Sequence, residues 1–233
     1  MSSIRKLINQ TAIYGTSSII GRFLNFLLTP LYALQFSNEQ YGIITEMYAY
    51  VAFLVVFLTY GMETAFFRFS TTNKEGKINI YSNTLYSLIT TSAIFVSMAT
   101  IFSQNIADWL KYPNHKEYII WFSLIVSLDA VSSIPLAKLR LQEKAKKFAL
   151  VNLLNVGVNI FLNLFFLIYC KEAYESGHQN WITENLYNPE IGVGYVFISN
   201  LIASVIKFGV LMPTMRFKGC LLYTSPSPRD RFL

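Results

Sequence analysis

The sequence predicts an all-α protein that crosses a membrane six times, and three observations carry this prediction. Of the 233 residues, 53% are hydrophobic and 14% are charged, whereas soluble domains carry about 25% charged residues. The mean hydropathy is +0.40. Six apolar runs are each long enough to cross the hydrocarbon core, which takes about 20 helical residues. These runs are 7–36, 41–67, 79–102, 117–140, 148–170 and 191–212.

The cations between these runs predict the topology. Twelve Lys and Arg residues lie in one set of connections and three lie in the other set. The richer set comprises the N-terminus, 68–78, 138–147 and 213–219, and the poorer set comprises 37–40, 103–116 and 171–190. Because Lys and Arg are enriched in cytoplasmic loops, we expect a cytoplasmic N-terminus and six crossings. The net charge of +6 then reflects topology, and we expect no nucleic-acid partner.

The first run, 7–36, contains a cation near its middle, Arg22. An arginine at the centre of a bilayer costs at least about 2.5 kcal/mol, so it normally faces a polar interior. Four polar residues of this run are spaced 4, 3 and 4 apart and therefore share one helical face. They are Ser18, Arg22, Asn25 and Thr29. We expect Pro30 to kink this helix because it removes a backbone hydrogen bond.

The next runs add local features. At the end of the second run, Glu63 and Arg68 are predicted to form a structural or gating ion pair. Residues 106–112 predict a short interfacial helix between the third and fourth runs. Pro135 is expected to kink the fourth run. The basic segment 138–147 predicts a cytoplasmic turn against anionic headgroups.

The fourth, fifth and sixth runs also carry buried polar residues. In the fifth run four asparagines are spaced 3, 4 and 4 apart, which places them in one stripe. Hydrogen bonding between packed helices is one explanation of such stripes, but buried charges on other helices favour a water-filled cavity that binds substrate. We also predict that Arg22 contacts Asp129, since a buried cation costs least when it is paired. The predicted cavity residues are Arg22, Asn25, Asp129, Asn152, Asn155, Asn159, Asn163, Asn200 and Lys207.

The sequence contains no motif that is typical of an enzyme active site or of a metal site. No phosphate-binding glycine loop, nucleophile motif or metal-ligand spacing is present, and His115 and His178 lie in predicted loops. Cys170 and Cys220 give no disulfide framework. We therefore expect a protein that is not an enzyme and has no metal site and no cofactor.

The C-terminal end differs from the rest of the chain. Residues Cys220–Asp230, CLLYTSPSPRD, resemble one translated frame of a transposase adapter that is used to prepare sequencing libraries. We therefore expect 220–233 to be non-native and the genuine sequence, 1–219, to be cut short. The alternative is a disordered tail rich in Ser and Pro.

Three segments carry a resemblance to a known family. QTAIYGTSSIIGRFLNFLLTPLY (Gln10–Tyr32), EQYGIITEMYAYVAF (Glu39–Phe53) and YGMETAFFRF (Tyr60–Phe69) resemble the polysaccharide-biosynthesis flippases of the multidrug/oligosaccharidyl-lipid/polysaccharide exporter superfamily, in particular Wzx-like O-antigen flippases. The later runs match mainly in length and topology.

The resemblance implies an architecture and a function. It implies twelve to fourteen helices in two six-helix lobes, of which this chain is the N-terminal lobe and lacks its C-terminal partner. It also implies a multi-pass protein of the bacterial inner membrane that serves surface polysaccharide or lipopolysaccharide biosynthesis. Such proteins move undecaprenyl-diphosphate-linked oligosaccharide from the inner to the outer leaflet by alternating access. Proton or sodium is a possible coupling ion.

Other functions remain open alternatives. A cation-coupled multidrug exporter of the same fold favours an acidic, aromatic cavity, which the predicted Arg, Lys and Asn lining does not match. A membrane glycan polymerase or ligase is expected to carry a large outer loop with catalytic Arg or His. The longest outer loop, 171–190, has one His and no Arg. A scaffold that transports nothing would leave the buried charges without a purpose.

Overall fold

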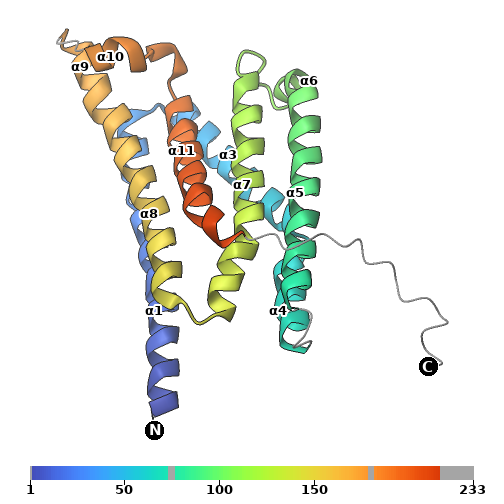
Figure 1. The fold of residues 1–233 in the computed structure, drawn as a ribbon. Coiled ribbons are helices and arrows are strands. Elements are labelled where there is room, and N and C mark those ends of the chain that lie inside the picture. Colours follow the sequence, from blue (N-terminus) through green and yellow to red (C-terminus); the bar gives the residue numbers. More distant parts are fainter. Residues whose placement is uncertain (1, 73–76, 178–180, 216–233) are drawn as a thin grey trace.

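The computed structural model describes residues 2–72, 77–177 and 181–215, and Figure 1 shows these residues as a bundle of helices. All regular structure among the described residues is helical. Six spans are long and apolar enough to cross a membrane, which confirms the predicted fold class. They are Thr11–Gln35, Asn38–Thr71, Ile80–Ile101, Lys116–Leu141, Ala145–Glu175 and Gly194–Thr214. The predicted non-native segment 220–233 lies outside the described residues.

The first span is interrupted near its end. Helix α1 (Ser2–Phe26) and helix α2 (Leu28–Gln35) are separated by Leu27. Pro30 cannot donate the hydrogen bond that the carbonyl of Phe26 would otherwise accept. The predicted irregularity at Pro30 therefore lies one turn before the proline itself.

The second span is also divided, which the sequence prediction of one run over 41–67 did not include. Helix α3 (Asn38–Thr59) begins with a capping box, in which Ser37 and Gln40 each bond to the other's backbone. It ends where Tyr60 and Gly61 both adopt left-handed conformations, with φ of 32° and 73°. Helix α4 (Met62–Thr72) continues beyond this break.

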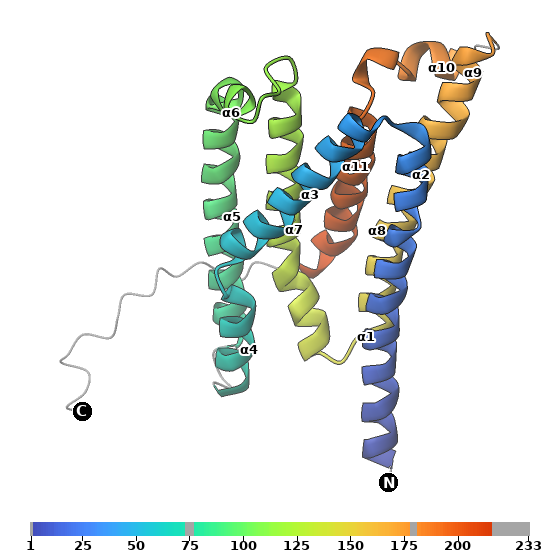
Figure 2. The ribbon, with the colours of Figure 1, turned by 180° about the vertical axis from the view of Figure 1, so that it is seen from behind.

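The third and fourth spans are more regular. Helix α5 (Lys77–Ile101) is followed by the short helix α6 (Ser103–Trp109), so the helix predicted at 106–112 exists but begins three residues earlier. Helix α7 (Lys116–Leu141) runs without interruption past Pro135. In Figures 1 and 2 the part of α7 beyond the end of α11 leans away from the rest of the helix.

The fifth span changes its helix type along its length. Helix α8 (Ala145–Leu164) passes into a π-helix, η1 (Phe165–Cys170), and then into α9 (Lys171–Glu175). The connection to the last span contains α10 (Trp181–Leu186) and the 3₁₀ turn η2 (Pro189–Ile191). Helix α11 (Gly194–Leu211) and the 3₁₀ turn η3 (Met212–Thr214) form the sixth span.

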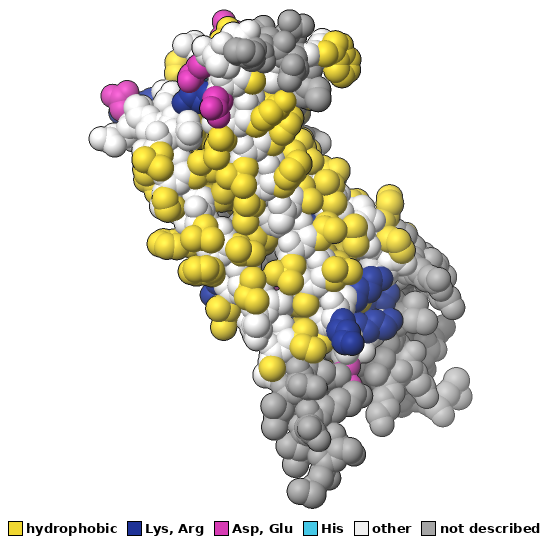
Figure 3. Space-filling model, turned by 90° about the vertical axis from the view of Figure 1, so that its left-hand side faces the viewer, with side chains coloured by type: hydrophobic (Ala, Val, Ile, Leu, Met, Phe, Trp, Pro, Cys, Tyr) yellow, Lys and Arg dark blue, Asp and Glu magenta, His cyan; other side chains and the backbone are white. Residues whose placement is uncertain are grey.

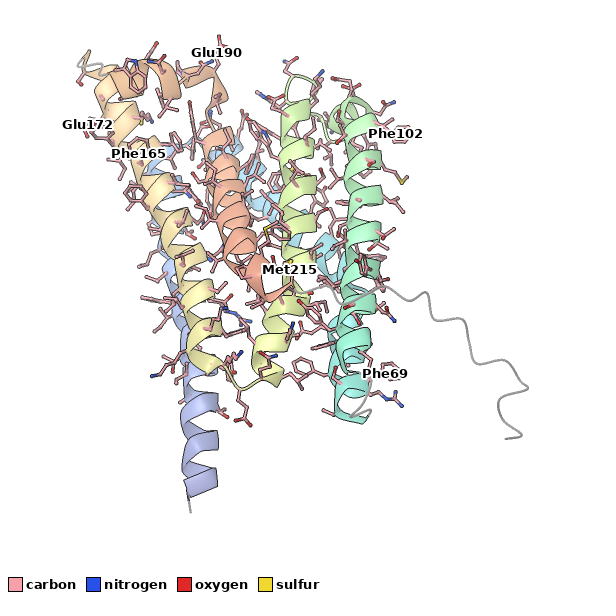
Figure 4. All side chains as sticks on the ribbon, in the orientation of Figure 1. Phe69, Phe102, Phe165, Glu172, Glu190 and Met215 are labelled. Atoms are coloured by element: carbon pink, nitrogen blue, oxygen red, sulfur yellow. The ribbon has the colours of Figure 1, made fainter. Side chains whose placement is uncertain are left out.

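The spans pack side by side in an order that differs from their order in the chain. Helix α1 packs against α8, and α11 packs against both α8 and α7. Helix α5 packs against α7, and α3 crosses α7 obliquely on the face that Figure 2 shows. The α9–α10 end, marked by Glu172 and Glu190, lies opposite the α4 end, marked by Phe69 (Figure 4).

Two apolar clusters fill the interior of the described part of the chain. One cluster lies toward the end with α6 and α10 and includes Met47, Phe122 and Phe197. The other lies toward the α4 end and includes Phe66 and Ile134. On the face that α8 presents in Figure 3, hydrophobic side chains cover the middle and charged side chains gather toward the two ends. This distribution matches a bundle with lipid around its middle.

Candidate functional site: a polar cavity between five helices

A polar cavity of about 390 Å³ lies between α1, α2, α3, α8 and α11. It occupies the part of the bundle nearest the α2–α3 turn, within the length of four membrane spans. No charged side chain is among the described residues that line it. The lining residues are Asn25, Leu28, Thr29, Tyr32, Tyr41, Ile44, Thr45, Tyr48, Asn155, Asn159 and Asn200.

The structure brings part of the predicted set of cavity residues together. Four of them, Asn25, Asn155, Asn159 and Asn200, line the cavity. The remaining five lie elsewhere and are Arg22, Asp129, Asn152, Asn163 and Lys207. That any of these residues binds a substrate stays a prediction.

Asn163 lies behind the cavity wall and connects two helices. Its side chain is completely buried. Tyr32 Oη donates to Asn163 Oδ1 over 3.0 Å, which joins α2 to α8. Asn163 Nδ2 donates to the backbone oxygen of Asn159 at 2.8 Å and to its Oδ1 at 3.1 Å. The amide therefore fixes the positions of Tyr32 and Asn159 in the cavity wall.

On the opposite wall, a hydrogen bond joins α11 to α3. Asn200 Nδ2 donates to Tyr48 Oη over 3.3 Å. The Tyr48 ring makes edge contacts with Phe122 of α7 and Phe197 of α11. The aromatic packing and the hydrogen bond together fix the phenol at the cavity edge.

Asp129 and Lys207 form an ion pair outside the cavity. Lys207 Nζ lies 2.5 Å from Asp129 Oδ1, and Ser204 Oγ donates to the same oxygen at 3.1 Å. The Asp129 side chain is 29% exposed and the Lys207 side chain is 11% exposed. Ser204 and Lys207 follow Asn200 at spacings of four and three residues and so share its face of α11. They contact Asp129 of α7 and do not line the cavity.

The predicted contact between Arg22 and Asp129 is wrong. Within the described residues no ion pair joins them, and Asp129 pairs with Lys207 instead. Helix α11 lies against α7, which carries Asp129, whereas α1 packs against α8. Lys207 therefore pairs with Asp129 because its helix is adjacent to α7. Arg22 was predicted to lie at a similar membrane depth to Asp129, but its helix packs against α8 instead.

Arg22 itself is exposed on α1, one turn before Asn25. Its neighbour Gly21 is buried, and a Cβ at that position would lie 3.5 Å from Val156 Cγ2. The helix thus contacts α8 through Gly21 and presents Arg22 beside that contact. Asn152 is partly buried near the start of the asparagine stripe and does not line the cavity.

At the α4 end, Glu63 pairs with Arg140 of α7. The Arg140 guanidinium also lies 5.4 Å from the Phe67 ring centroid and 5.5 Å from that of Phe148. Arg140 thus links α4, α7 and α8. The predicted pairing of Glu63 with Arg68 stays a prediction, and the sequence pattern did not indicate Arg140 as a partner.

Sequence reasoning also missed the tyrosine side of the cavity. Tyr41, Thr45 and Tyr48 on α3 all line it. Their spacing of four and three residues puts them on one helical face, and this signal was present in the sequence. Among the described residues, no group of three or more His, Cys, Asp or Glu side chains is placed to hold a metal ion.

These features define a multi-pass membrane protein whose spans enclose an uncharged polar cavity. The family model for polysaccharide biosynthesis proteins matches residues 35–225, and the chain belongs to this family. Membership indicates a role in polysaccharide biosynthesis at a membrane. No curated protein and no solved structure gives a significant match.

Proposed function

We propose that this protein is a flippase, which moves an undecaprenyl-diphosphate-linked oligosaccharide from the inner to the outer leaflet of the bacterial inner membrane. The observation that carries the proposal is the uncharged polar cavity inside the spans of a polysaccharide biosynthesis protein. Amide and hydroxyl groups both donate and accept hydrogen bonds, as sugar hydroxyls require. The cavity volume of about 390 Å³ lies within the range of small-molecule pockets, about 300–1,000 Å³.

The distribution of contacts along the bundle supports a transport role. The cavity lies toward the α2–α3 turn. The α4 end is instead closely packed, by an apolar cluster and by the contacts of Arg140. With the predicted cytoplasmic N-terminus, the cavity belongs to the outer half of the membrane and the packed end to the inner half. In the proposed cycle these two ends open alternately, against a second lobe.

Arg22 is the proposed contact for the diphosphate of the cargo. Lys207 is already paired with Asp129, which leaves it less suited to bind an anion than the sequence suggested. Arg22 is exposed and lies one turn from the cavity residue Asn25. A guanidinium binds phosphate oxygens in a bidentate manner.

The experiment replaces Arg22 in the full-length protein of a host that depends on it for surface glycan. We expect Arg22→Ala to abolish surface glycan while the protein stays in the membrane. Ile19→Ala is the matched control, because Ile19 lies on the same helix, is 69% exposed and is apolar. Normal glycan export by Arg22→Ala would refute the proposed role of this residue.

The location of the accumulated precursor distinguishes a flippase from a polymerase. Loss of a flippase leaves the lipid-linked unit on the inner leaflet, where a lectin added to spheroplasts cannot reach it. Loss of a polymerase leaves single units on the outer leaflet, where the lectin binds them. Precursor that is accessible to lectin in cells without the protein would contradict the flippase proposal.

A further inference from the structure

Hydrogen bonding divides the asparagines of α8 into two kinds. Asn159 and Asn163 bond to one another, and Asn163 also accepts from Tyr32. Across the cavity, Asn200 bonds to Tyr48. Each of these amides already has a protein partner, and each connects parts of the wall. Their presence is explained by the architecture of the cavity.

Asn155 is different. It lines the cavity one turn from Asn159, and its Nδ2 atom is buried without a hydrogen-bond partner among the described residues. Burial of an amide donor without an acceptor is unfavourable. Because Nδ2 has almost no accessible surface, a small rotation of the Asn155 side chain brings it to the cavity, where a ligand supplies the missing acceptor and removes this penalty. The rest of the cavity wall offers no charged group that would favour an ion there.

We propose that Asn155 is the residue that recognises the sugar, by donating from Nδ2 to an oxygen of an uncharged sugar ring next to the diphosphate. This inference rests on the proposed flippase function and names one specificity-determining residue within its cavity. The acceptor is a hydroxyl, a ring oxygen or an acetamido carbonyl, since each presents a lone pair without a charge. Tyr32 and Tyr41 line the same space, and aromatic side chains combine an apolar ring with a polar hydroxyl.

Two probes separate the sugar from the rest of the cargo. One is farnesyl diphosphate linked to N-acetylglucosamine, and the other is farnesyl diphosphate alone. Affinities are measured by microscale thermophoresis on full-length protein in lipid nanodiscs. We expect the wild-type protein to bind the probe with the sugar more tightly. Asn155→Leu should lower that affinity about tenfold, the effect of losing one buried hydrogen bond, and should not change binding of farnesyl diphosphate.

The melting temperature without ligand provides a second readout. Asn155→Leu removes a buried donor that lacks a partner, so we expect an unchanged or higher melting temperature. A merely structural asparagine would instead give a lower one. Asn155→Asp keeps the shape of the side chain but loses the donor, and it should also lose the preference for the sugar. The control is Asn152→Leu, because Asn152 belongs to the same stripe but lies outside the cavity.

The outcomes separate this inference from the proposed function. If the wild-type protein prefers the probe with the sugar and both Asn155 variants keep that preference, Asn155 does not recognise the sugar and the flippase proposal stands. A lower melting temperature of Asn155→Leu without ligand would show a structural role and overturn the inference. If the wild-type protein binds neither probe, both the inference and the proposed function are contradicted.

Discussion

Lys207 Nζ and Asp129 Oδ1 lie 2.5 Å apart, and this ion pair joins α11 to α7 inside the bundle. Ser204, one turn from Lys207 on α11, donates to the same carboxylate oxygen. The two charges therefore neutralise each other and leave the neighbouring cavity uncharged. They also connect the wall that carries Asn200 to the central helix of the bundle.

The first prediction concerns this pair. Lys207→Met leaves the carboxylate without its counter-charge and should lower the free energy of unfolding by about 3 kcal/mol. The double variant Asp129→Leu/Lys207→Met removes both charges and should recover most of that loss. Thermal or denaturant unfolding of the purified proteins measures both effects. Equal or larger destabilisation in the double variant would contradict the assignment.

The second prediction concerns the hydrogen bond that fixes the cavity wall. Tyr32→Phe removes the donor to Asn163 Oδ1, which is completely buried. We expect a loss of about 1–3 kcal/mol, because the buried oxygen loses its partner. Tyr41→Phe is the control, since Tyr41 also lines the cavity and no hydrogen bond joins its hydroxyl to a described residue. Tyr41→Phe should change the free energy of unfolding by less than about 0.5 kcal/mol. Similar losses in the two variants would contradict a stabilising role of the hydrogen bond from Tyr32.

The third prediction concerns the start of α11. A Cβ at Gly194 would lie 2.9 Å from both Ile191 Cγ2 and Trp121 Cζ3, so the close approach of η2 and α7 requires glycine. Gly194→Ala should cost about 1–3 kcal/mol through overpacking. On the same helix, a Cβ at Gly209 would meet nothing within 4 Å. Gly209→Ala should stabilise the protein by up to about 1 kcal/mol. A melting temperature of Gly194→Ala at or above that of the wild type would contradict the close packing at Gly194.

The fourth prediction compares Arg140, which pairs with Glu63 in the structure, with Arg68, the partner that the sequence predicts. Arg140 and Glu63 are 35% and 37% exposed, so solvent weakens the pair, and a double-mutant cycle should give a coupling of about 0.5–1 kcal/mol. A second cycle pairs Glu63→Gln with Arg68→Gln and tests the contact that the sequence predicts. A larger coupling in this second cycle would make Arg68 the main partner of the carboxylate.

The sequence located the six spans because each is a long apolar run, and this signal does not depend on neighbouring helices. Pro30 indicated the break between α1 and α2, since it removes a local hydrogen bond. The break at Tyr60 and Gly61 was missed, because one glycine inside an apolar run does not by itself predict two left-handed residues. The capping box at Ser37 is a local signal of the same kind, because Ser37 and Gln40 are three residues apart.

The candidate site was harder to predict. Helical spacing showed which asparagines share a face, but it did not show which helix that face contacts. Asp129 and Arg22 were matched by depth along their helices, whereas the choice of partner depends on which helices are adjacent. The order α1, α8, α11, α7 arises from long-range packing, and a single sequence carries no signal for it.

The π-helix η1 (Phe165–Cys170) determines how the fifth span can change its length. It begins just after the Asn152–Asn163 stripe. Because a π-helix holds about one more residue in a turn than an α-helix, this segment carries one residue in excess. Deleting one residue of η1 would convert it to an α-helix without rotating that stripe relative to α9. A deletion inside the stripe would instead rotate the following residues by about 100°. We therefore expect relatives with a fifth span one residue shorter to have lost that residue within η1, where the change leaves the cavity wall intact.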